Sequence, residues 1–249
     1  MLEARNLNKS FGSIVATDDV SVSFGEEAGE MVFVVGPNGA GKSTLVNLLT
    51  GLLEPDSGSV LLDGEDITDM RPDRRVHEGL VRSFQVVRVF DGMTVRENLR
   101  TTVLAREGKT RSLFSLSDEH GTVEESVERL LEQFRLDDVA GTPAEELPHG
   151  DRKLLDVAMS FGLDPEYLLL DEPTSGVSAG ETDHVIETIV DVGEQEGVTT
   201  VTIEHDMDLV RGYADRVIAL HQGSVHGEGP ASMLETDREL RRLLLGVEA

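Results

Sequence analysis

The chain has 249 residues, of which 39% are hydrophobic, and this is enough for one large or two small domains with a real core. It contains no cysteine, which excludes disulfides, thiolate catalysis and cysteine-ligated zinc. No stretch approaches the roughly 18 apolar residues of a membrane span, and the first residues lack the layout of a signal peptide, so we expect a chain that is cytosolic in itself.

The chain is strongly acidic, with 22 basic and 48 acidic residues and a net charge of -26. The carboxylates are spread from Glu3 to Glu248 and are not gathered in a tail. Such a surface repels phosphate backbones, so we expect no nucleic-acid partner. Because the Debye length falls to about 3 Å at 1 M salt, the charge predicts a halophilic protein from a salt-rich cytoplasm. An acidic protein of an ordinary cytoplasm is the alternative.

The first 62 residues alternate like short strands. Val20, Val22 and Phe24 fall on one face, and residues 57–62 follow a Pro-Asp-Ser-Gly turn, which predicts antiparallel hairpins. Between the hairpins lies MVFVV, residues 31–35, a continuous apolar run typical of a strand that is buried on both faces. We expect a helix to follow over residues 42–53.

The middle of the chain differs from both ends. Residues 86–160 contain no convincing buried strand, and residues 106–121 have the composition of a long exposed loop. Apolar residues recur there at helical spacing, namely Val123, Val127, Leu130, Leu131 and Phe134. These features predict an inserted helical subdomain.

Two further buried strands are predicted over residues 167–170 and 198–203. The amphipathic stretch 181–194 lies between them, with Val185, Ile186, Ile189 and Val190 facing inward. Strands that alternate with helices imply a mostly parallel sheet. The fold class is therefore α/β, with an antiparallel β subdomain, a mostly parallel core sheet and the inserted helical subdomain.

The strongest chemical signal is GPNGAGKST, residues 36–44, which satisfies the phosphate-loop pattern G-x-x-x-x-G-K-[ST] between a buried strand and a helix. Its glycines let backbone N–H groups converge on phosphates at a helix N-terminus. Lys42 supplies a charge at the β- and γ-phosphates, Ser43 offers a hydroxyl to Mg²⁺, and Thr44 is placed for a further phosphate contact. The predicted nucleotide-binding loop consists of Gly36, Pro37, Asn38, Gly39, Ala40, Gly41, Lys42, Ser43 and Thr44. A plain glycine-rich turn is the alternative.

Four more residues are candidates for the site: three follow buried strands, and Gln85 lies in the segment VRSFQ, read as a loop. Asp171 ends the strand at 167–170 and can hold a magnesium shell, while Glu172 can orient and deprotonate a water. His205 can reach a γ-phosphate or that water, and Gln85 can ligate magnesium. Taken alone, each has a structural alternative: a turn cap for the acidic pair, an ordinary structural histidine, and a glutamine in solvent.

In identity and order, these motifs resemble those of the ATP-binding-cassette (ABC) ATPases over essentially the whole chain. The resemblance implies a RecA-like core and antiparallel subdomain over residues 1–85 and 161–249, with the helical subdomain at 86–160. It also implies ATP and Mg²⁺ as cofactors, with Ser43, Gln85 and Asp171 toward the metal. The residues that it implies for catalysis are Lys42, Gln85, Glu172 and His205.

The same resemblance assigns further nucleotide contacts. Phe11 would stack on adenine, although an edge-strand core residue is the alternative. Residues 147–151, Leu-Pro-His-Gly-Asp, occupy the signature position, so Leu147, His149 and Gly150 would face the nucleotide of the opposite subunit. The family usually has Leu-Ser-x-Gly-Gln there. The serine hydroxyl is therefore missing and Asp151 is set to repel phosphate, although Pro148 suits a first helical turn. Ser178 stands where many relatives carry aspartate.

Within the superfamily, VRSFQ, VFDGMTVREN, EHDMDLV and the ending LLLGVEA resemble the ATPases of branched-chain amino acid and urea importers. This implies a peripheral subunit on the inner face of the cell membrane, with two membrane permeases, a second ABC ATPase and, indirectly, a solute-binding protein. The unusual signature favours a heterodimer over a homodimer. Three alternatives stay open: the ATPase of a lipid or lipopolysaccharide exporter, a soluble ABC protein that acts on ribosomes or DNA, and a non-catalytic regulatory subunit.

Overall fold

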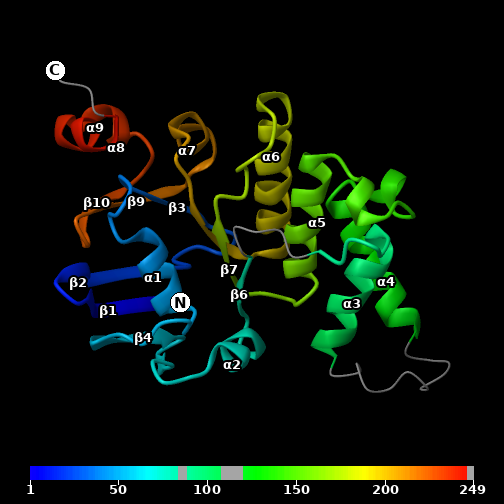
Figure 1. Ribbon diagram of the computed structural model, residues 1–249, viewed down its shortest axis with the longest axis horizontal. Coiled ribbons are helices and arrows are strands. Elements are labelled where there is room, and N and C mark those ends of the chain that lie inside the picture. Colours follow the sequence, from blue (N-terminus) through cyan, green and yellow to red (C-terminus); the bar gives the residue numbers. More distant parts are fainter. Residues whose placement is uncertain (84–88, 108–119, 246–249) are drawn as a thin grey trace.

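The computed structural model describes residues 1–83, 89–107 and 120–245. Gln85 and most of the loop predicted over residues 106–121 lie outside this range. Within it, the strands form two sheets and the helices cover them (Figure 1).

The smaller sheet is antiparallel and has the strand order β2-β1-β4-β5. Its strands are β1 (Leu2–Phe11), β2 (Ile14–Phe24), β4 (Ser57–Leu62) and β5 (Glu65–Asp66). Val20, Val22 and Phe24 are all buried, as their alternation predicts. The expected hairpins at the N-terminus are thus confirmed.

The larger sheet has six strands in the order β10-β9-β3-β8-β7-β6, and all its pairings are parallel except that of β10. Its strands are β3 (Met31–Val35), β6 (Leu80–Arg82), β7 (Tyr167–Asp171), β8 (Thr199–Ile203), β9 (Arg216–His221) and β10 (Ser224–Gly229). Every residue of β3 is buried because a hydrophobic cluster covers each face of the sheet: Val32 and Val34 belong to one, and Met31, Phe33 and Val35 to the other. The three predicted buried strands are confirmed, whereas β6, β9 and β10 were not predicted.

Outside the middle of the chain, the described helices follow strands of the two sheets, and the last two come after β10. They are α1 (Lys42–Leu49), α2 (Pro72–His77), α6 (Ala179–Glu196), α7 (Met207–Tyr213), α8 (Met233–Thr236) and α9 (Arg238–Leu245). The predicted end of α1 at residue 53 was wrong: the chain leaves the helix before Gly51, which has a left-handed φ of 73°. Buried Arg75 donates to the free carbonyls of Leu48 and Leu49 at this helix end. Helix α6 is longer than expected and ends at Gly197, which has a left-handed φ of 70°.

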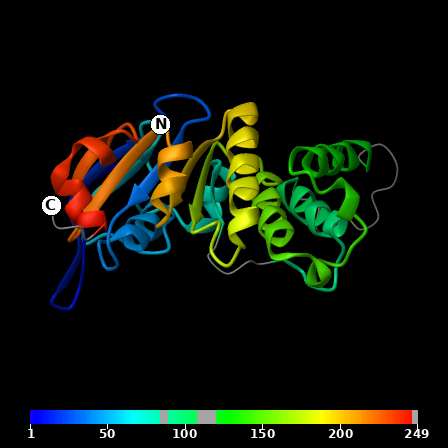
Figure 2. The same ribbon diagram turned by 90° about the horizontal axis from the view of Figure 1, so that it is seen from above.

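The middle of the chain is helical, with no strand in its described part between residues 89 and 160. It contains α3 (Val95–Arg106), α4 (His120–Gln133), α5 (His149–Phe161) and 3₁₀ turns at Asp137–Val139 and Ala144–Glu146. The five apolar residues predicted to share a face of α4 and its end are all buried. Figures 1 and 2 show these helices at one end of the molecule, with β1 and β2 toward the other.

The helical end packs on the sheet through one continuous hydrophobic core. This core joins α3, α4 and α5 to Leu168 and Leu170 of β7 and to Val185 and Ile189 of α6. Movements of the helices are therefore transmitted to the strand that ends at Asp171. None of the helices in the described part of the chain is both long and apolar enough to span a bilayer.

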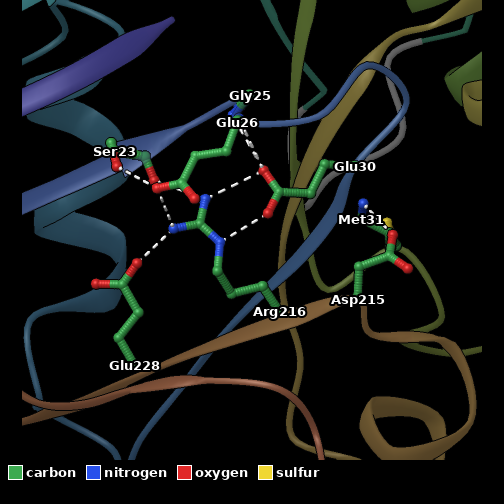
Figure 3. A network of polar contacts seen from close by, with 8 residues as sticks. All are labelled: Ser23, Gly25, Glu26, Glu30, Met31, Asp215, Arg216 and Glu228. Atoms are coloured by element: carbon green, nitrogen blue, oxygen red, sulfur yellow. Dashed lines mark hydrogen bonds and ion pairs between the residues drawn. The ribbon is translucent and has the colours of Figure 1, made fainter.

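A buried ion pair fastens the two sheets together (Figure 3). At the start of β9, Arg216 donates from Nε to Glu30 Oε1 at 2.7 Å and from Nη2 to the carbonyl of Ser23 at 2.8 Å. Glu228 of β10 contacts the same guanidinium. The guanidinium is therefore surrounded by acceptors from β2, β10 and the segment before β3, and it is fully paired despite its burial.

Candidate active site

A cleft of about 310 Å³ lies where three neighbouring parallel strands end. The glycine-rich loop follows β3, Glu172 follows β7, and His205 follows β8. Because the carboxyl ends of parallel strands meet at one edge of a sheet, this topology gathers the three motifs. The cleft is lined by Phe11, Ile14, Val15, Ala16, Asn38, Gly39, Ala40, Gly41, Lys42, Ser43, Thr44, Glu172, Ile203 and His205.

The glycine-rich loop is packed tightly against the β1–β2 hairpin. Gly41 directly precedes α1 with a φ of 103°, and a Cβ built there would lie 2.3 Å from the carbonyl oxygen of Ala16. No side chain fits in that space, so glycine is required at this position. The backbone can thus bring the N-terminus of α1, with its positive end of the helix dipole, to the cleft.

Lys42 is buried and folds over its own loop. Its Nζ donates to the carbonyl of Gly36 at 2.6 Å and to that of Pro37 at 3.2 Å. Burial lowers the pKa of Lys42, while the carboxylates of Glu172 and Asp171 act in the opposite direction. The ammonium is therefore held at the loop, where it faces the charges that it is expected to neutralise.

Glu172 and His205 form a pair across the cleft. Glu172 Oε1 lies 3.0 Å from His205 Nε2. The backbone of Glu172 has a left-handed φ of 50°, and its N–H donates to the carbonyl of Ile203 at 3.0 Å. This strained turn ties the end of β7 to β8 and aims the carboxylate at the histidine. A carboxylate and an imidazole in this geometry can accept and orient a water molecule.

Glu204 supports this pair and was not predicted from the sequence. It is only 4% exposed. Its Oε1 accepts from Thr174 Oγ1 at 2.6 Å, and its Oε2 accepts from the backbone N–H of His205 at 3.1 Å. The carboxylate therefore joins the turn after Glu172 to the start of the loop that carries His205. An acidic residue directly after a fully buried strand is the signal that could have found it.

Asp171 ends β7 as predicted, and its charge is already paired. Arg82 Nη2 donates to Asp171 Oδ2 at 3.0 Å, and Arg82 Nη1 donates to Asn47 Oδ1 at 2.5 Å. Arg82 and Asn47 were not singled out in the sequence, because nothing local indicates that β6 and α1 meet there. Gln85, the other expected metal ligand besides Ser43, lies outside the described residues.

Phe11 lies at the mouth of the cleft beside Ile14 and Val15. Its side chain is exposed, so it is not a core residue of an edge strand. Lys9 Nζ lies 5.9 Å from the centre of the Phe11 ring. An exposed aromatic ring with aliphatic neighbours is a suitable surface for a flat heterocycle.

The signature segment, residues 147–151, lies outside the cleft. Leu147 is buried in the helical core, and no residue of the segment lines the cleft. Helix α5 begins at His149, so Pro148 precedes the helix instead of lying in its first turn. Burial, followed by the charge of Glu181, raises the pKa of Asp151, and His184 opposes this shift. The side chain of Glu181 also lies beside Gly150.

Ser178 directly precedes α6. Its hydroxyl donates to Glu181 Oε2 at 2.6 Å and thereby fixes that acidic side chain at the first turn of the helix. Two carboxylates, those of Asp151 and Glu181, consequently meet where α5 and α6 begin.

A glycine-rich loop between a strand and a helix, opposite a carboxylate–histidine pair on adjacent strands, defines a phosphate-loop nucleotide-binding protein. The family model for the ABC transporter matches residues 19–175. The probable branched-chain amino acid transport ATP-binding protein LivG of Archaeoglobus fulgidus is 33% identical over 254 residues, covering 100% of this chain and 96% of its own length. The high-affinity branched-chain amino acid transport ATP-binding protein BraF of Pseudomonas aeruginosa is 33% identical, covering 99% and 98%.

Among solved structures, the ADP conformation of an ATP-binding cassette of an ABC transporter superposes with a TM-score of 0.84 at 28% identity, covering 99% of both chains. The chain belongs to the ABC transporter family, as its ATPase subunit. The predicted fold class and family are confirmed.

Proposed function

We propose that this chain hydrolyses ATP to drive an importer for branched-chain amino acids or a similar small polar solute such as urea. The observation that carries the proposal is the Glu172–His205 pair at 3.0 Å, in the same cleft as the phosphate loop. The end-to-end match to relatives named for branched-chain amino acid transport supports the choice of solute class.

Several cleft residues have a role in this proposal. Phe11 stacks on adenine, and the loop N–H groups together with Lys42 bind the phosphates. To do so, Lys42 exchanges the carbonyls of Gly36 and Pro37 for phosphate oxygens. Glu172 orients the attacking water and accepts its proton, while His205 holds the water and the γ-phosphate in line.

The residues present fit a magnesium ion. The hydroxyl of Ser43 and the carboxylate of Asp171 are the hard oxygen donors that Mg²⁺ prefers, and we expect Gln85 to join them. When bound, Mg²⁺ would supply charge neutralisation at the phosphates. The chain itself holds Asp171 at the end of β7 and Ser43 in the first turn of α1.

We also propose that the chain acts at the inner face of the cell membrane with two permeases and a second, different cassette. The acidic signature supports a heterodimer. Asp151 and Glu181 meet beside Gly150, and two carboxylates disfavour binding of a phosphate from a partner subunit. In the reconstituted complex, Pro148→Ser should raise ATP turnover by restoring the hydroxyl, and unchanged turnover would contradict this proposal.

The test is to extract the tagged chain from its native membranes in high salt and to identify the co-purifying proteins by mass spectrometry. We expect two permeases, a second cassette and a solute-binding protein. The complex is then placed in liposomes and ATP-driven uptake of labelled leucine and urea is compared, with Glu172→Gln as the matched inactive control. Recovery with ribosomes or chromatin alone, or ATP-driven export of lipid, would overturn the proposal.

A further inference from the structure

A charged cluster joins the end of β7 to the phosphate-loop helix. Arg82 is the last residue of β6, Asp171 is the last of β7, and Asn47 lies on α1. The guanidinium of Arg82 donates to Asp171 Oδ2 at 3.0 Å and to Asn47 Oδ1 at 2.5 Å. Arg82 therefore bridges Asp171 to the helix that begins with Lys42 and Ser43.

The ion pair in this cluster is shielded from water. The side chains of Arg82 and Asp171 are each only 10% exposed. An ion pair in such surroundings is weakly screened by salt, and the planar guanidinium fixes the geometry of the groups that it binds. A pair at the surface would leave the carboxylate free to rotate. Salt therefore cannot release Asp171 from this contact easily, even in a strongly saline cytoplasm.

Asp171 keeps one oxygen outside this contact. Its Oδ2 accepts from Arg82, and no residue that the structure describes donates a hydrogen bond to its Oδ1. The carboxylate is also close enough to Lys42 to raise the pKa of that ammonium against the effect of burial. Arg82 thus fixes one carboxylate oxygen of Asp171, and the carboxylate lies near the start of α1.

We propose that Arg82 is a positioning residue, which holds Asp171 in register with Ser43 so that both oxygen donors are in place for magnesium. Asn47 is the second anchor, because it fixes the guanidinium to α1 itself. The inference rests on the proposed magnesium-dependent ATPase function and deepens it. Outer residues that orient a metal ligand commonly change metal affinity by about 10-fold to 100-fold when they are removed.

The experiment measures magnesium affinity directly and does not rely on turnover. The full-length chain is titrated with a fluorescent ATP analogue in EDTA, and then with rising Mg²⁺ at fixed nucleotide. For Arg82→Met, we expect the Mg²⁺ midpoint to rise by about 10-fold or more while nucleotide affinity in EDTA stays within about twofold of the wild type. Arg82→Lys keeps the charge but lacks the planar fork that holds both partners in fixed geometry, so its Mg²⁺ midpoint should lie between those of the wild type and Arg82→Met.

Arg216→Met is a matched control. Arg216 is also about one-tenth exposed, and its buried partner is Glu30, outside the cleft (Figure 3). Loss of this pair should lower the unfolding temperature and leave the Mg²⁺ midpoint unchanged. The comparison separates general destabilisation from an effect on the metal site.

An unchanged Mg²⁺ midpoint in Arg82→Met, or an equal loss of affinity in EDTA and in Mg²⁺, would overturn the inference. If Arg82→Met does not fold, Asn47→Ala provides the same test, since it removes one anchor and keeps the ion pair. A raised midpoint then supports the inference and an unchanged one refutes it. If Mg²⁺ does not alter nucleotide affinity in the wild type, the metal part of the proposed function fails first, and the inference falls with it.

Discussion

Two glycines of the phosphate loop allow a test of how closely the β1–β2 hairpin supports the nucleotide cleft. Gly39 and Gly41 both have positive φ values, 82° and 103°. A Cβ at Gly39 would have no atom within 4 Å, whereas one at Gly41 would lie 2.3 Å from the carbonyl oxygen of Ala16. Gly39→Ala therefore isolates backbone strain, and Gly41→Ala adds a clash with rigid backbone.

The difference between the two variants follows from these contacts. Backbone strain for alanine at such a φ costs about 1–2 kcal/mol. Moving the carbonyl of Ala16 by the roughly 1 Å that the clash demands adds about 1–3 kcal/mol, as overpacking does elsewhere. We expect Gly39→Ala to lower the unfolding temperature by about 2–8 °C and Gly41→Ala by about 4–20 °C, at about 2–4 °C per kcal/mol for a chain of this length.

The assay is thermal and urea unfolding in the absence of nucleotide, so that a Cβ cannot clash with a phosphate. Binding of the fluorescent ATP analogue is then measured separately. Because Ala16 itself lines the cleft, Gly41→Ala should also weaken nucleotide binding. If Gly41→Ala were no more destabilising than Gly39→Ala, the tight support of the loop by Ala16 would be refuted.

Four further results are expected. In the assembled complex, Glu172→Gln should slow phosphate release by about 10²–10⁴-fold with ATP still bound, because a general base is lost; hydrolysis at the normal rate would remove Glu172 from that role. Glu204→Gln should lower turnover, because the neutral amide holds Thr174 and the backbone of His205 less firmly; turnover equal to that of the wild type would contradict this supporting role. Asp151→Asn should stabilise the chain at neutral pH. Burial and Glu181 raise the folded pKa of Asp151, so ionisation opposes folding, and the gain in urea midpoint should shrink as the pH falls toward about 3.9. Finally, KCl should raise the unfolding temperature steadily between about 0.1 and 2 M, because screening relieves self-repulsion of the acidic surface; a flat response would contradict adaptation to salt.

The larger features of the fold could be predicted because they are periodic or continuous in the sequence. The apolar run at residues 31–35 and the helical spacing of apolar residues in α4 each indicate buried residues directly. The edge strands β6 and β10 escaped prediction because they are short or only partly buried, and hence carry little hydrophobic pattern. The end of α1 was misplaced although Gly51, two residues after the helix, has a left-handed φ of 73° and is a local stop signal. Arg75, far along the chain, adds hydrogen bonds to the last carbonyls.

The same distinction holds in the cleft. Lys42, Glu172 and His205 stand next to motifs or at strand ends, where their position in the chain predicts their position in space. Arg82 and Glu204 act through side-chain contacts between elements that are far apart in the sequence, and such contacts have no local pattern. Long-range partners of this kind become evident only once the topology is known.

The position of the signature segment indicates which nucleotide cleft it can contact. Within the part of the chain that the structure describes, none of the residues 147–151 lines the cleft, although the helical core holds Leu147 firmly in place. The start of α5 lies away from the cleft of its own chain, so its polar groups are suited to contact a nucleotide in the cleft of another subunit. This placement agrees with the second cassette proposed above. If the proposed heterodimer forms, the partner's cleft should turn over slowly, because this chain would offer it an acidic helix end at Asp151. The cleft with Glu172 and His205 would then depend on the partner's own signature.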